Sequence, residues 1–153
     1  MSRGTAGETD MEYYVVRNKS GYLMLFNHKP VRGEDGEWAA PLNTPTPTSN
    51  GMLLEQFPST FGEFVDVTSD TDPVEVEFVE VYHKTKIWIC RDADGKLYAF
   101  AIHPPFKFKN RNVWMQVSHY GYNFCEIDSS LFPEVTWECE ERNINVRLKR
   151  VVR

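Results

Sequence analysis

The chain has 153 residues, a formal net charge of −5, and 41% hydrophobic residues. This length suits one medium domain, or two small lobes that share one core. The acidic balance argues against general binding of duplex nucleic acid, which depends on clustered Lys and Arg.

The chain opens on residues 1–11, which are mostly small and polar and predict a disordered tail. They do not resemble a secretory leader, and no apolar run approaches the roughly 20 residues that span a bilayer. Cys90, Cys125 and Cys139 are odd in number and far apart, which favours buried free thiols in a reducing compartment. We therefore expect a soluble, cytoplasmic protein without a membrane partner.

Residues 87–105 repeat the pattern of residues 13–31. Each copy has an apolar run, a polar turn that ends in glycine, and a second apolar run, which is typical of a β-hairpin. We expect the glycine to have positive φ where the return strand begins. The apolar runs do not alternate with polar residues, so both strand faces need cover. Identical residues at matched positions are Arg17 and Arg91, Gly21 and Gly95, Leu23 and Leu97, Phe26 and Phe100, and Pro30 and Pro104.

We therefore interpret the chain as two tandem units, residues 12–82 and residues 86–153. The first unit carries a Thr/Pro-rich insert at 41–50, where the prolines prevent both a helix and a strand ladder. The predicted fold class is mainly β, or β-rich α+β at most. Because an isolated hairpin is at best marginally stable, the two hairpin-based repeats are expected to pack as one pseudo-twofold domain.

Each unit is expected to close with a strand of alternating polarity. The first closing strand carries Glu75 and Glu77 on its polar face, and the second carries Arg147 and Lys149. If these strands lie side by side, the acidic and basic side chains would face each other. The alternative is two unrelated solvated faces.

The second unit also contains residues 104–112, in which phenylalanines alternate with Lys and Arg. This pattern suits stacking and charge contacts with a nucleotide or single-stranded nucleic acid, and a hairpin arm with one buried face is the competing interpretation. Residues 113–117 and 122–127 predict a further hairpin. Residues 51–61 are compatible with one short helical turn.

No catalytic or metal-binding motif is present in the sequence. The four histidines, His28, His83, His103 and His119, lack the spacing of a zinc site, so no metal is expected. The chain has no nucleophile elbow, no Gly-rich phosphate loop and no dinucleotide fingerprint, so neither an enzyme nor a cofactor is predicted. The acidic stretch 92–95 partly resembles a calcium loop, but hairpin turn chemistry already explains it.

Three functions remain open at this stage. The first is non-enzymatic binding or assembly, with a protein partner or a second copy of the chain at the sheet edges. The second is binding or sequestering of a nucleotide or other small anionic ligand through the loops after Pro30 and Pro104. The third is a hydrolytic enzyme without a recognisable motif. Candidate ligand-binding residues for the second function combine cations with stacking side chains: His28, Arg32, Trp38, Lys107, Lys109, Arg111 and Trp114.

The stretch 88–100, followed by Pro104, Trp114 and the run Ser130-Leu131-Phe132-Pro133-Glu134-Val135, resembles short proteins of gut bacteria and their phages. In those proteins one such unit can be the whole chain. The resemblance covers most of residues 86–149 and, more loosely, residues 12–81. It implies a phage or mobile-element accessory protein, located in a virion or in the host cytoplasm, and it implies no particular activity.

Overall fold

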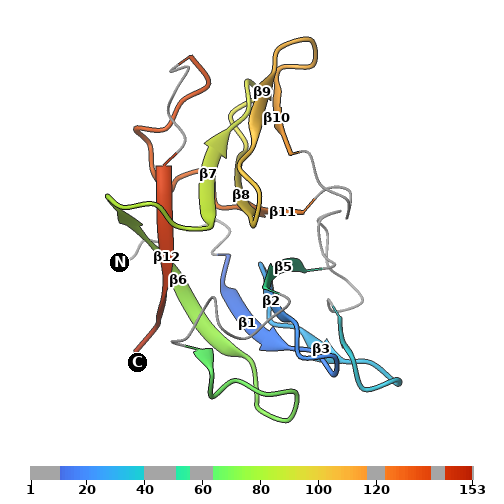
Figure 1. The fold of residues 1–153 in the computed structure, drawn as a ribbon. Coiled ribbons are helices and arrows are strands. Elements are labelled where there is room, and N and C mark those ends of the chain that lie inside the picture. The colour runs from blue at the N-terminus through green and yellow to red at the C-terminus, as the bar shows by residue number, and fades with distance from the viewer. Residues whose placement is uncertain (1–10, 40–50, 56–63, 117–122, 139–143, 153) are drawn as a thin grey trace.

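The computed structural model describes residues 11–39, 51–55, 64–116, 123–138 and 144–152. Within these ranges the chain forms strands and turns and no α-helix, which confirms the mainly β prediction (Figure 1). The Thr/Pro-rich insert and all of the predicted tail except Met11 lie outside the described residues. The strands are β1 (Tyr13–Arg17), β2 (Leu23–Phe26), β3 (Val31–Arg32), β4 (Trp38–Ala39), β5 (Met52–Glu55), β6 (Val74–Val81), β7 (Ile87–Arg91), β8 (Leu97–Ala101), β9 (Phe106–Phe108), β10 (Val113–Met115), β11 (Phe124–Ile127) and β12 (Ile144–Arg150).

Eight of these strands form one antiparallel sheet in the order β11, β8, β7, β12, β6, β1, β2, β5. The two predicted hairpins are β1 with β2 and β7 with β8. The closing strands β6 and β12 pair with each other in the middle of the sheet, so they do lie side by side. Glu77 is opposite Lys149, whereas Arg147 is opposite Val79. The strand order is that of two mirrored sets of four, although descent from a tandem duplication stays a prediction.

The turns of the two hairpins have matching contacts. Gly21 and Gly95 have φ angles of 90° and 93°, which glycine adopts without steric cost, as predicted. Arg17 and Arg91, the last residues of β1 and β7, donate hydrogen bonds to the carbonyl oxygens of these glycines at 2.9 and 2.8 Å. Each arginine therefore fixes a later loop against its hairpin, because it also donates to the carbonyl oxygens of Phe64 and Val67, or of Ser129, Leu131, Phe132 and Val135.

One apolar core joins the two hairpins. Val15 and Leu25 from the first hairpin and Ile89 and Leu97 from the second are fully buried in the same cluster. Burial of each such side chain contributes about 1.5–3 kcal/mol to the free energy of unfolding. The two hairpins therefore share a core, as the fold prediction requires.

The edge strands of the sheet, β5 and β11, are bridged by side chains. Asn123, just before β11, accepts a hydrogen bond from the Leu53 N–H at 2.8 Å and donates one to the Leu53 carbonyl oxygen at 2.8 Å. Asn27 donates to the carbonyl oxygen of Glu126 at 2.9 Å. The Asn123 amide thus takes the role that the peptide group of a neighbouring strand would have.

One local prediction is wrong, and a second is wrong for residues 51–55, the part of its range 51–61 that the structure describes. Residues 113–117 and 122–127 do not form a hairpin, because β10 pairs with β9 and β11 pairs with β8. The part of that prediction at 117–122 lies outside the described residues. In the range compatible with a helical turn, residues 52–55 form β5 against β2. Met52 and Leu54 enter the core with the period of two that a strand requires.

Candidate functional site

A second apolar cluster lies on the face of the β7–β8 hairpin that points away from the main core. Successive side chains of a strand alternate between faces, so Cys90 and Phe100 project opposite to Ile89 and Ala99. Trp114 of β10 packs on Cys90 and Phe100 and is itself buried. This is the cover on the second face that the unbroken apolar runs predicted.

The β9–β10 hairpin, called the arm below, is held over this face by hydrogen bonds to the β7–β8 turn. The backbone N–H of Trp114 donates to Asp92 Oδ1 at 2.9 Å, and its indole Nε1–H donates to the Arg91 carbonyl oxygen at 3.1 Å. The backbone N–H of Ala93 donates to the Asn112 carbonyl oxygen at 3.1 Å. The arm is therefore positioned at both its turn and its second strand.

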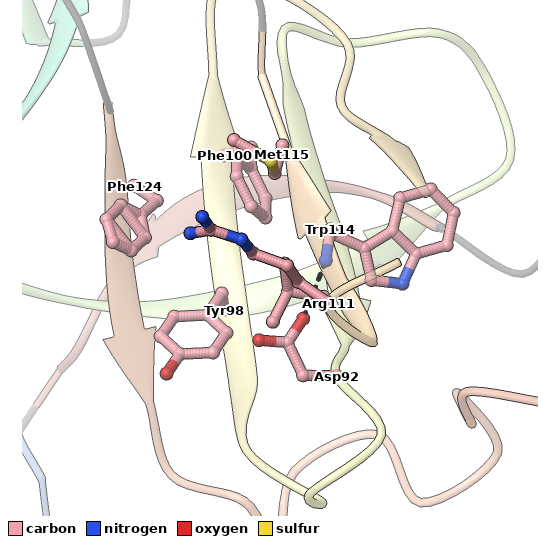
Figure 2. A pocket seen from close by; sticks show the side chains of 8 residues that line it. Asp92, Tyr98, Phe100, Arg111, Trp114, Met115 and Phe124 are labelled. Atoms are coloured by element: carbon pink, nitrogen blue, oxygen red, sulfur yellow. Dashed lines mark hydrogen bonds between the residues drawn. The ribbon is translucent and has the colours of Figure 1, made fainter. Parts of the chain in front are cut away.

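A pocket of about 370 Å³ lies between the arm and the sheet face (Figure 2). This volume falls in the range of about 300–1,000 Å³ that small-molecule sites occupy. Phe124 lies 5.9 Å from Phe100 and 5.3 Å from Tyr98 between ring centroids, so these rings form a continuous aromatic wall. The lining residues are Asp92, Tyr98, Phe100, Arg111, Val113, Trp114, Met115 and Phe124.

Asp92 is an acidic group of this lining, with only 7% of its surface exposed. One carboxylate oxygen accepts the hydrogen bond from Trp114, and among the described residues no hydrogen bond reaches the other oxygen, Oδ2. Figure 2 shows that second oxygen on the side of Tyr98. Burial raises the pKa of Asp92 to about 6, the Trp114 hydrogen bond lowers it by less, and the nearby Asp94 raises it further. A perturbed acid in a pocket is a typical mark of a functional site.

Arg111 is a basic group of the lining and is exposed. In Figure 2 its side chain extends across the pocket toward Phe124. The turn of the arm fixes its place, since the Arg111 N–H donates to the Phe108 carbonyl oxygen at 3.2 Å and Asn112 has a φ of 59°. The pocket therefore combines an exposed cation with a buried acid.

The other groups near the pocket that could act as nucleophiles are held neutral. Burial raises the pKa of the Cys90 thiol, and the negative charge of Asp92 raises it further. Burial also raises the pKa of Tyr98 to about 12. A thiol or phenol that stays protonated at neutral pH is a poor nucleophile. Among the described residues of the lining, Asp92 thus has a pKa shifted toward neutrality.

The candidate residues from the second unit belong to the arm and lie in or beside the pocket. Arg111 and Trp114 line it. The Lys107 ammonium lies 4.3 Å from the centre of the Trp137 ring and 5.9 Å from that of Trp114, and it donates to the Trp137 carbonyl oxygen. Lys109 is exposed in the turn of the arm.

The candidate residues from the first unit, residues 12–82, lie elsewhere. Arg32 pairs with Trp38 in the small β3–β4 sheet, with its guanidinium carbon 4.2 Å from the centre of the indole ring. The Nδ1 atom of His28 lies 2.8 Å from Asn27 Oδ1. Figure 1 shows β3 at the opposite end of the molecule from β9 and β10. The seven candidate residues therefore do not form a single site.

Sequence reasoning missed Asp92 and the aromatic wall. Tyr98 and Phe100 alternate with Leu97 and Ala99, which indicates a second covered face but does not tell a packed face from a pocket. Asp92 has the sequence context of an ordinary turn aspartate. Asp92 is buried because the arm folds over the turn, which the sequence alone does not reveal.

No protein-family model, curated protein or solved structure matches this chain. The described residues hold no group of three or more His, Cys, Asp or Glu side chains placed to bind a metal ion. Nor does the described part of the chain include a helix with the length and apolarity needed to cross a membrane. Fold and site together define a mainly β protein with an aromatic pocket, and its function is argued from that pocket.

Proposed function

We propose that this chain is a non-enzymatic binding protein whose pocket takes a planar, anionic small molecule of the nucleotide class. The observation that carries the proposal is the aromatic pocket of about 370 Å³ with Arg111 in its lining. Stacking on aromatic side chains contributes about 1–3 kcal/mol per base. The planar guanidinium of Arg111 suits a phosphate or carboxylate group, because it donates two parallel hydrogen bonds.

The chemistry of the lining favours binding over catalysis. Among the residues that the structure describes, the lining includes no serine, threonine, cysteine or histidine. Hydrolysis by a covalent route requires a nucleophile beside a base that activates it. The nearby Cys90 thiol has a raised pKa and lies fully buried below the Phe100 face, so it does not meet this requirement.

The structure gives less support to assembly through free sheet edges. That hypothesis depends on unpaired edge strands, whereas Asn123 bridges β11 to β5 and Asn27, just after β2, donates to β11. The resemblance to phage and gut bacterial proteins stays a prediction. It is compatible with a small accessory protein that sequesters a ligand.

Calorimetric titration of the full chain with AMP, CMP and UMP, and with the matching nucleosides, tests this proposal. We expect saturable binding of nucleotides, weakened about tenfold in Arg111→Ala because a charge-assisted hydrogen bond is lost, with little change for nucleosides. Arg32→Ala is the matched control, since Arg32 is an exposed cation beside Trp38 in the other hairpin. Absence of binding by all these compounds, or equal weakening in both variants, would contradict the proposal.

A further inference from the structure

The ionised carboxylate of Asp92 is energetically unfavourable at its buried position. Only 7% of the surface of this residue is exposed, and Asp94 beside it adds a like charge. Burying a charge without a compensating partner is unfavourable. No ion pair to Arg111 relieves Asp92 within the described residues, and the causes that shift its pKa include no nearby cation. A feature that costs stability in this way invites a functional explanation.

The turn itself does not need this charge. The first hairpin has Asn18 at the matched position, and its turn closes in the same way: the N–H of Asn18 donates to the Tyr22 carbonyl oxygen at 2.9 Å, as the N–H of Asp92 does to that of Lys96. The neutral Oδ1 of Asn18 accepts from the N–H of Tyr22 in its own turn at 2.9 Å, whereas Oδ1 of Asp92 accepts from the N–H of Trp114 in the arm at 2.9 Å. The acid is therefore not explained by hairpin geometry.

What distinguishes the second turn is its place at the pocket. Asp92 lines the pocket with Tyr98, whereas the first hairpin has Met24 in the position matched to Tyr98. Asp92 and Tyr98 therefore occur together in the second hairpin, and neither has its like in the first. Oδ2 of Asp92 is a strong acceptor placed beside a surface on which a planar ring can stack.

From this juxtaposition we infer that the pocket selects a heterocycle with an exocyclic amino group, as in adenine or cytosine, and that Oδ2 of Asp92 accepts a hydrogen bond from that group. The inference rests on the proposed function and deepens it. Uracil presents a carbonyl oxygen where cytosine presents the amino group. Two acceptors would then face each other in a desolvated site, which is unfavourable.

The test uses calorimetry to compare the affinities of the wild-type chain for ligands that differ only at the exocyclic amino group. The pairs are AMP with purine riboside 5′-monophosphate, which lacks only the amino group, and CMP with UMP. We expect the amino-bearing member of each pair to bind at least about tenfold more tightly, because a site built around a hydrogen bond rejects the ligand that lacks it.

The variant Asp92→Asn then tests whether the preference for amino-bearing ligands depends on this residue. Its Oδ1 can keep the Trp114 hydrogen bond, which leaves the amide NH₂, a donor, facing the pocket. The preference for CMP over UMP should disappear or reverse. Asp94→Asn, in the same turn but exposed, is the matched control and should keep the preference.

The outcomes separate the two proposals. If no nucleotide binds, the proposed function fails, and this inference fails with it. If nucleotides bind through Arg111 without any preference between the paired ligands, the proposed function stands and the amino-group inference is wrong. A preference that persists in Asp92→Asn would overturn the role of Asp92.

Discussion

The backbone N–H of Trp114 donates to the carboxylate of Asp92 at 2.9 Å, and this contact joins the arm to the turn of the β7–β8 hairpin. The two residues also line the same pocket. The hydrogen bond that positions the arm therefore also fixes one of the two oxygens of the buried acid. Under the proposed function, the other oxygen serves the ligand, and stability and binding are coupled at this pair.

Replacing Asp92 with Asn should stabilise the ligand-free protein at neutral pH. The folded-state pKa of about 6 lies above the ordinary value of 3.8, so the folded chain holds its proton more tightly than the unfolded chain does. The stability from this group is therefore present at low pH and is lost as pH rises from about 4 to about 6. Urea denaturation across this window should show the advantage of Asp92→Asn growing with pH. A variant that is less stable than wild type above the window would contradict this account of the buried charge.

Ligand affinity should change with pH in the opposite sense. The amino group of the ligand requires the ionised carboxylate of Asp92 as acceptor, so affinity for AMP should fall as pH drops through about 6. Titrations above and below this pH measure the change. The phosphate of AMP also titrates at about pH 6, so the part of the change that belongs to Asp92 is the difference between wild type and Asp92→Asn. Equal changes in the two proteins would count against Asp92 as the acceptor.

Asn123→Ala should destabilise the sheet where β5 and β11 approach. The Leu53 N–H and carbonyl oxygen would lose the partner that they have at 2.8 Å each. A buried polar group left unpaired costs about 1–3 kcal/mol. Chemical denaturation measures the loss, with Asn110→Ala, an exposed position in the arm, as control. Equal stability of the two variants would show that water replaces the Asn123 amide.

Arg91→Lys should lower the free energy of unfolding although the charge is kept. The Arg91 guanidinium donates to the carbonyl oxygens of Gly95, Ser129, Leu131, Phe132 and Val135, which one ammonium group does not reproduce. Hydrogen bonds from charged donors contribute about 1.5–3 kcal/mol each, so a loss of at least that size is expected by thermal or urea denaturation. Arg147→Lys on the exposed face of β12 should change stability by little. A similar effect of the two substitutions would contradict the role of Arg91 in fixing the loop.

Local chemistry made part of the fold predictable. The turns at Gly21 and Gly95 require positive φ, and apolar runs flank each of them, so the sequence alone predicts both hairpins. The pairing of β6 with β12 was one of two interpretations that their opposite charges left open, and of the four charged residues named for it only Glu77 and Lys149 are opposite each other in the register. These features depend on residues that are close in sequence, or on simple complementarity between two strands.

The sequence alone does not predict the pocket, because the pocket depends on which strands pair when they are far apart in the sequence. Residues 113–115 have an apolar pattern that suits either a neighbour at 106–108 or one at 124–127. In the structure the first choice creates the arm, and β11 joins β8 instead. Phe124 and Trp114 then lie on the same face of the hairpin, with Asp92 between the arm and the turn.

The most direct test of the central claim is an NMR titration that follows the indole and backbone N–H signals of Trp114 as AMP is added. Trp38, which also carries a cation over its ring but lies in the β3–β4 sheet, is the internal reference. We predict saturable shifts of the Trp114 signals, together with those of Arg111, while Trp38 stays unchanged. Saturable shifts centred on Trp38, or no saturable shift at Trp114, would show that the pocket beside Asp92 is not the binding site.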